Sequence, residues 1–164
     1  MRRLGLAIGL FLLGSLTGIV TWHLATEHPA NEAVAERFKM KRDGYERLRA
    51  MLIEDEKIRE VAPWGVRTIS IGLPQQPPTP EISLQRYALY QSILADLGAL
   101  SATRSDGPDP STCILVWTSG WAGGAIHVEV CRFHGDTSPL NSDKPARYSY
   151  FSLGDHWFGV RDDM

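Results

Sequence analysis

The sequence predicts an α+β domain that follows an N-terminal transmembrane helix. Three observations indicate this fold class. Residues 4–22 carry no charged side chain, two later segments repeat apolar residues at helical spacing, and the C-terminal third alternates apolar with polar residues as β-hairpins do. Because consecutive hairpins build antiparallel sheets, we expect two helices packed on a mainly antiparallel sheet of about five strands, built from two C-terminal hairpins.

The composition is that of one globular domain without a nucleic-acid-binding surface. The chain has 164 residues, of which 43% are hydrophobic and 22% charged, a balance that allows a buried core. Its net charge is −2, and without Arg2 and Arg3 the remainder has 15 basic against 19 acidic residues. Nucleic-acid-binding domains usually present a basic surface, so we expect no nucleic-acid partner.

Residues 4–22 predict a membrane anchor. This stretch of 19 uncharged residues would extend about 28 Å as a helix, close to the thickness of a bilayer's hydrocarbon core. Arg2 and Arg3 precede it, and basic flanking residues stay on the cytoplasmic side. We therefore expect a single-pass protein of the bacterial inner membrane, with its N-terminus in the cytoplasm and its C-terminal domain periplasmic or extracellular.

A cleaved signal peptide is the alternative interpretation of this stretch. Signal peptides have apolar regions of about 7–15 residues and small residues at the cleavage site. Cleavage after Ala25 or Ala30 would put His23 or His28 three residues before the cut, where they fit poorly. No cysteine precedes Cys113, which excludes a lipoprotein anchor. The expected divisions are a cytoplasmic stub and signal-anchor over 1–26, a linker over 27–32 and an extracytoplasmic α+β domain over 33–164.

A helix, a strand and a second helix are expected before the hairpins. Asn31 can cap a first helix from about residue 32 to 56, with Gly44 as a point of bending, and residues 57–61 either continue it or become extended. Residues 66–72 are rich in β-branched side chains, which favours a strand.

Prolines and a second capping residue define the next segment. Residues 73–81 contain four prolines, typical of an extended connector. Ser83 can cap a helix that runs to Leu97, and Gly98 is a suitable terminator. Residues 101–112 are polar and include glycine and proline, so we expect a loop there.

Residues 113–131 organise the predicted sheet as one β-hairpin. The segment divides into a strand over 113–119, a tight turn over 120–124 and a strand over 125–131. Side chains alternate between the two faces of a strand, so pairing symmetrically about residue 122 fixes both faces. One face then pairs Ile114 with Val130, Val116 with Val128 and Thr118 with Ile126; the other pairs Cys113 with Cys131, Leu115 with Glu129 and Trp117 with His127.

The predicted register brings the only two cysteines together. Outside the cytoplasm, two cysteines facing each other across a hairpin can form a disulfide, so we expect Cys113 and Cys131 to be joined. Closing a loop of this length is worth roughly 3 kcal/mol in the chain-entropy model. Two free, partly buried thiols are the alternative. The absence of a CxxC motif argues against redox catalysis.

A second hairpin is predicted at the C-terminus, after a loop over residues 134–146. Its strands are residues 147–153 and 156–162, joined by a turn at Gly154 and Asp155. Phe151 then opposes Phe158. The loops over 101–112 and 134–146 are candidate contact surfaces.

The sequence contains no recognisable catalytic or metal-binding motif. His127, Glu129 and Cys131 share a predicted strand face and are partly of metal-ligand type, but no HxxxH or paired-cysteine spacing accompanies them. Ser119 precedes a glycine-rich turn, which lacks the strand-to-helix setting of a hydrolase nucleophile. We therefore expect no catalytic residue, no metal and no cofactor. The face of Trp117, His127 and Glu129 is the candidate interaction surface.

Several short motifs carry a resemblance to other proteins. They are Leu48-Arg49-x-Met51-Leu52-x-Glu54-Asp55, the run from Ile82 to Gly98 with Arg86, Tyr90 and Leu94, and the Tyr148-x-Tyr150 and Trp157-Phe158 pairs. In these pieces the chain resembles small membrane-anchored or lipoprotein-like bacterial proteins of unknown function, some of which are immunity-like. The resemblance implies a toxin-neutralising, protein-binding role and supplies no active site. The chain departs from that group in its cysteine-bearing hairpin and in having no lipidation cysteine.

Taken together, these observations predict a non-enzymatic, protein-interaction module held at the membrane by residues 4–22. Two alternatives remain open at this point: a small periplasmic hydrolase or metal-dependent enzyme, and a ligand-binding domain.

Overall fold

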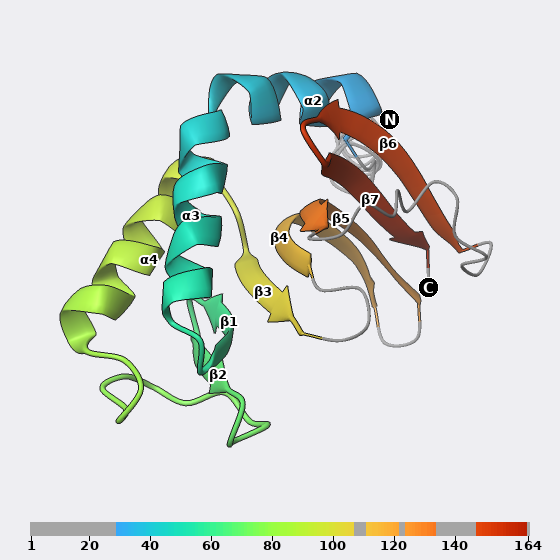
Figure 1. The fold of residues 1–164 in the computed structure, drawn as a ribbon. Coiled ribbons are helices and arrows are strands. Elements are labelled where there is room, and N and C mark those ends of the chain that lie inside the picture. The colour runs from blue at the N-terminus through green and yellow to red at the C-terminus, as the bar shows by residue number, and fades with distance from the viewer. Residues whose placement is uncertain (1–28, 107–110, 122–123, 134–146, 164) are drawn as a thin grey trace, which may run out of the picture.

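The computed structural model of the chain describes residues 29–106, 111–121, 124–133 and 147–163. In these residues three helices pack on one antiparallel sheet of seven strands (Figure 1). The predicted α+β class is therefore confirmed, with one helix and about two strands more than the sequence indicated. The strand order is β2-β1-β3-β4-β5-β7-β6.

The first predicted helix is divided in two. Helix α2 (Asn31–Met40) and helix α3 (Arg42–Glu54) meet at Lys41, whose φ of −117° and ψ of 21° are not helical. The break is thus not at Gly44, which lies inside α3 and serves a packing role instead. A Cβ atom at Gly44 would lie 2.9 Å from Leu97 Cδ2, so glycine allows α3 to approach the next helix closely. The N-terminal cap of α2 is Ala30, and Asn31 is the first helical residue.

Helix α4 (Leu84–Leu97) matches its prediction at both ends. The Ser83 hydroxyl accepts a hydrogen bond from the Arg86 amide at 3.1 Å, and Gly98 ends the helix with a φ of 59°. The buried face of α4 is formed by Tyr90, Ile93, Leu94 and Leu97. Helices α3 and α4 lie side by side, and α2 crosses the end of the sheet near β6 and β7 (Figure 1).

The sheet begins with a hairpin that the sequence showed only in part. Strand β1 (Ile58–Ala62) pairs with β2 (Gly65–Thr68). Strand β2 ends at Thr68 and is shorter than the strand predicted over 66–72. The proline-rich segment then returns beside β2, because Val66 and Gln75 exchange backbone hydrogen bonds of 2.7 and 2.8 Å.

Strand β3 (Ser101–Ser105) replaces part of a predicted loop. Its polar side chains find partners in the fold: Arg104 donates to the Leu52 carbonyl at 3.0 Å, and the Thr103 hydroxyl donates to the Cys113 carbonyl at 3.3 Å. The remaining strands are β4 (Ser111–Trp121), β5 (Gly124–Phe133), β6 (Tyr148–Gly154) and β7 (Trp157–Asp163).

The hairpin of β4 and β5 contains a β-bulge at Val116. Near the cysteines the predicted register holds, with Leu115 opposite Glu129. Beyond Leu115 it shifts by one residue, so Trp117 pairs with Val128 and Thr118 with His127. The predicted pairs Val116–Val128, Trp117–His127 and Thr118–Ile126 are therefore wrong, because the bulge inserts one extra residue into β4.

The second hairpin is also displaced by one residue from its prediction. Its turn residues are Asp155 and His156, with φ values of 49° and 64°, and two positive φ values are typical of a two-residue hairpin turn. Phe151 consequently pairs with Gly159, not with Phe158. The ring of Phe151 lies over Gly159 so closely that a Cβ atom there would be 2.0 Å from it.

The helices cover one face of the sheet, and the main core lies between them. Trp157 of β7 is fully buried there, with its ring 5.4 Å from Phe38 of α2 and 6.1 Å from Tyr45 of α3. We call the opposite face of the sheet the distal face. Because Val128 and Val130 point into the core, the alternate residues of β5, including Glu129 and Cys131, point to the distal face.

Among the residues that the structure describes, no helix is long and apolar enough to cross a membrane. The predicted anchor over 4–22 and the predicted loop over 134–146 lie outside the described residues.

Candidate functional site

The distal face carries a hollow of about 470 Å³ across the middle of the sheet. Four strands position its lining, because every second side chain of β4, β5, β6 and β7 points to this side. The described lining residues are Ser111, Cys113, Glu129, Cys131, Phe133, Arg147, Tyr148, Tyr150 and Val160.

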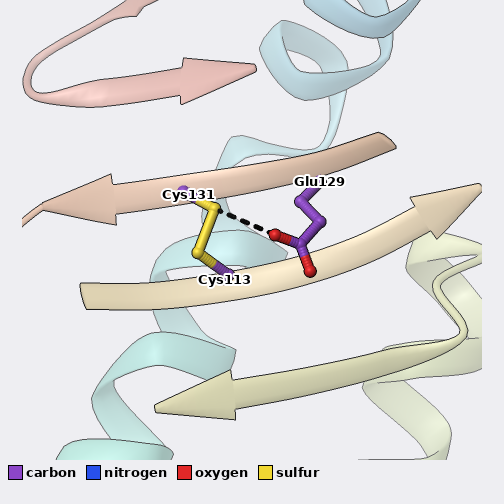
Figure 2. A group of neighbouring side chains, drawn as sticks. All are labelled: Cys113, Glu129 and Cys131. Carbon is purple, nitrogen blue, oxygen red and sulfur yellow. Dashed lines mark hydrogen bonds between the residues drawn. A yellow bond between two sulfur atoms is a disulfide. The ribbon is translucent and has the colours of Figure 1, made fainter. Parts of the chain in front are cut away.

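A disulfide forms the floor of the hollow. The sulfur atoms of Cys113 and Cys131 are 2.10 Å apart and join the two central strands (Figure 2). The predicted pairing of Cys113 with Cys131 is confirmed. The cysteines differ in exposure: Cys113 is half-buried, whereas Cys131 is 1% exposed.

Glu129 is the one described carboxyl group in the lining, and it lies against the disulfide. Its Oε2 atom is 3.7 Å from Cys131 Sγ, the contact drawn as a dashed line in Figure 2. Burial raises the pKa of Glu129, and the negative charge of Asp162 raises this pKa further. A disulfide sulfur carries no hydrogen, so a hydrogen bond between these two groups requires the proton to be on the carboxyl of Glu129.

Aromatic side chains and a guanidinium group form the rim. Arg147 donates to the Tyr148 hydroxyl at 2.6 Å, and its guanidinium carbon lies 4.7 Å from the centre of the Tyr148 ring. Arg147 also lies 3.4 Å from the carboxylate of Asp162. The rings of Tyr148 and Tyr150 are 6.4 Å apart, and burial raises the pKa of Tyr150. Phe133 packs edge-on to Phe158 beside them, at 5.8 Å.

This hollow therefore combines flat aromatic walls with one positive group and one half-buried acid. Such a surface can bind a side chain or small molecule that offers both an apolar part and a polar end.

Comparison with known families, curated proteins and solved structures found no match to this chain. The geometry of the described residues must therefore carry the functional argument.

The structure separates the three residues of the predicted interaction surface. Glu129 and His127 both lie on the distal face of β5, the first in the hollow and the second opposite Thr118. Trp117 instead packs against the buried cluster on the helix side, because the bulge at Val116 turns it toward the core. The expectation that all three share one face is thus wrong for Trp117.

One group of described residues has metal-ligand geometry. The ligand atoms of Cys113, Glu129 and Cys131 all lie within 4.8 Å of one another. Metals bind cysteine as the thiolate, and a disulfide supplies no thiolate. The group is thus not a metal site while the disulfide is intact. His127 is not part of this group.

A second cluster joins the end of α3 to the start of α4. Arg86 donates to Asp55 and to Glu54, each at 2.8 Å, and the Tyr90 hydroxyl donates to Asp55 at 2.7 Å. The positive charge of the guanidinium partly neutralises the two carboxylates. We therefore interpret the cluster as a structural ion pair that joins α3 to α4.

The sequence reasoning missed most of the hollow. The alternation in Tyr148-x-Tyr150 was a usable signal, because it places two tyrosines on one strand face. No sequence pattern marks Arg147, Phe133 or Val160 as members of the hollow. Their proximity depends on how β5, β6 and β7 are ordered in the sheet.

Proposed function

We propose that this chain is a membrane-anchored, extracytoplasmic domain that binds another protein, in a non-enzymatic and immunity-like role. The observation that carries the proposal is the aromatic hollow on the distal face. The three described helices lie against one side of the sheet (Figure 1). The hollow lies on the other side, which these helices leave uncovered.

The lining of the hollow has the composition of a protein-binding hot spot. Tyrosine and arginine are enriched where truncation costs most binding energy, and they act best in hollows that exclude water. Tyr148, Tyr150 and Arg147 provide these residue types at one rim. The disulfide beneath them fixes the two central strands, so the surface is already ordered before a partner arrives.

The same lining offers little support for a hydrolase. Ser111 is its one aliphatic hydroxyl among the described residues, and no histidine lies beside it in the lining that the structure describes. A serine nucleophile requires an adjacent base to be activated. Binding without chemistry is therefore the better-supported role.

The anchoring part of the proposal rests on the uncharged stretch over 4–22 and its two preceding arginines. Helix α2 begins at Asn31, so only a short segment separates the stretch from the domain. A phosphatase reporter that is active only after export, fused after Met164, tests the topology. We expect activity outside the cytoplasm, and an inactive fusion would overturn the anchored arrangement.

Site-specific cross-linking tests the binding surface. A photoreactive amino acid at Tyr148, on the rim, should cross-link one defined protein in cells, whereas the same group at Gln85, exposed on α4, should not. With that partner purified, Arg147→Ala or Tyr150→Ala should raise Kd by about tenfold or more. Gln85→Ala should leave Kd unchanged. Equal cross-linking from both positions, or unchanged affinity in the rim variants, would contradict the proposal.

The volume of the hollow favours a ligand-binding domain as the second candidate. At about 470 Å³ the hollow lies within the roughly 300–1,000 Å³ typical of small-molecule sites. Native mass spectrometry of protein isolated from its own cells distinguishes the candidates. A bound small molecule that is lost in Tyr150→Ala would replace the protein-binding proposal.

A further inference from the structure

We propose that the Cys113–Cys131 disulfide undergoes thiol–disulfide exchange with an external dithiol, and that Glu129 protonates the Cys131 thiolate as it leaves. The external dithiol belongs to a small molecule or to a dithiol protein. This activity is separate from the binding role proposed above and does not depend on it. It rests on the different exposure of the two cysteine residues, on the hollow and on the placement of one acid.

The hollow gives a thiolate access to one end of the disulfide. Both cysteines line it, but Cys113 is half-buried while Cys131 is 1% exposed. Exchange begins with attack by a thiolate on one sulfur, and the sulfur attacked is selected by access. The structure therefore assigns Cys113 Sγ as the attacked atom and Cys131 Sγ as the leaving atom.

Glu129 is placed at the leaving atom. Its Oε2 atom is 3.7 Å from Cys131 Sγ (Figure 2). Because burial favours the neutral form of the carboxyl, a proton is held beside the sulfur on which negative charge develops. A buried thiolate without a partner would be costly, so delivery of this proton stabilises the product.

The exchange balances without another reactant. The external thiolate forms a bond to Cys113 Sγ, the bond between the two protein sulfurs breaks, and its electron pair leaves on Cys131 Sγ. Glu129 gives its proton to that thiolate and regains one from solvent. The second thiol of the dithiol, as its thiolate, then attacks the external sulfur of the mixed disulfide and releases Cys113 as a thiolate, which takes a proton from solvent. The protein disulfide is reduced to two thiols, and the dithiol is oxidised to its own disulfide.

Asp162 is the charged group that shifts the pKa of Glu129, and other titratable groups share the same face of the sheet. Opposite it on β4 lies Leu115, which carries no charge, and opposite it on β7 lies Val160. Among the described residues, the titratable and charged groups that share its face are His127 of β5, Asp162 of β7, Tyr148 and Tyr150 of β6, and Arg147, which precedes β6. Asp162 raises the pKa of Glu129, and Arg147 lies 3.4 Å from Asp162 and offsets part of its charge.

Reduction of the full chain by dithiothreitol tests the proposal. The rate is divided by the concentration of dithiothreitol thiolate at each pH, which leaves the contribution of the protein. We expect this corrected rate to fall as pH rises through the pKa of Glu129. In Glu129→Gln, which keeps the shape of the side chain, the corrected rate should be about tenfold slower at low pH and independent of pH.

Asp96→Asn is the matched control, because Asp96 is an exposed carboxylate on α4, on the helix side of the sheet. It should keep the rate and the pH profile of the unsubstituted chain. Equal rates and profiles for Glu129→Gln and the unsubstituted chain would overturn the role of Glu129.

The position of attack is tested by a measurement that needs no variant. The reaction with glutathione is stopped early by alkylation, and peptides are mapped by mass spectrometry. We expect glutathione on Cys113 and the alkyl group on Cys131. The reverse distribution would overturn the assignment of Cys113 as the attacked residue. A disulfide that resists reduction until the protein is unfolded would overturn the exchange itself.

Discussion

Trp157 and Glu46 are 111 positions apart in the sequence, and the indole Nε1 of Trp157 donates a 2.8 Å hydrogen bond to Glu46 Oε1. The same oxygen accepts from Arg132 at 3.0 Å. One carboxylate of α3 thus satisfies donors from β5 and β7. This bond attaches the last strand of the sheet to the helices that precede it in the chain.

Replacing Glu46 should therefore destabilise the domain. In Glu46→Ala the buried indole N–H of Trp157 loses its acceptor, which should cost about 1–3 kcal/mol of the free energy of unfolding. Glu46→Gln retains an amide oxygen that can accept, and should cost less. Chemical denaturation measures both. Glu36→Ala, at an exposed position of α2, is the control; a loss as large as that of Glu46→Ala would contradict this explanation.

The disulfide should contribute measurably to stability. The two cysteines are 18 positions apart, and closing a loop of that size is worth roughly 3 kcal/mol in the chain-entropy model. The double variant Cys113→Ala, Cys131→Ala should unfold at a lower denaturant concentration by that amount. A reductant should lower the stability of the unsubstituted chain and leave the double variant unchanged. A double variant that responds to reductant would show that the effect lies elsewhere.

Stability should depend on pH through Glu129. Its pKa in the folded state is raised above the ordinary value of 4.5, so the folded state binds the proton more tightly than the unfolded state. The contribution is fully present below about pH 4.5 and is lost as pH rises through the folded pKa. We expect the stability of the unsubstituted chain, measured relative to Glu129→Gln, to decline over that window in urea unfolding experiments.

Asp155 provides a control for this experiment, because its contribution to stability changes with pH in the opposite direction. The hydrogen bond from Arg42 lowers the pKa of Asp155 below its ordinary 3.8. Stability from this pair is present above that ordinary value and is lost as pH falls through the lowered pKa. A Glu129 difference that declines toward acid, as the Asp155 contribution does, would contradict the assignment.

Gly159 should not tolerate a side chain. A Cβ atom there would lie 2.0 Å from the ring of Phe151, so Gly159→Ala must displace the ring and should cost about 1–3 kcal/mol. Gly72→Ala is the control, because no atom lies within 4 Å of the added carbon. In a Phe151→Ala background the cost of Gly159→Ala should largely disappear. Equal costs in both backgrounds, measured by thermal unfolding, would exclude the ring as the cause.

Local signals explain which parts of the fold the sequence could predict. The limits of α4 follow from Ser83 and Gly98, two residues that act within their own turns of chain. The pairing of Cys113 with Cys131 follows from strand alternation over a few residues. In each case the information lies within the segment itself.

The failures have a different physical origin. Leu115, Val116 and Trp117 are all apolar, so nothing in the pattern marks Val116 as the extra residue of a bulge. Strand β3 is polar, and it is stabilised by partners far away in sequence, such as the Leu52 carbonyl that accepts from Arg104. The hollow likewise depends on strand order, because β7 lies between β5 and β6.

The place of β7 also has a consequence for the order of folding. Arg161 of β7 donates to the carbonyl of Pro29, and Trp157 fills the space between α2 and α3. The helices leave the ribosome before β7, the strand that completes their packing. The core around Trp157 can therefore close only after β7 has been synthesised.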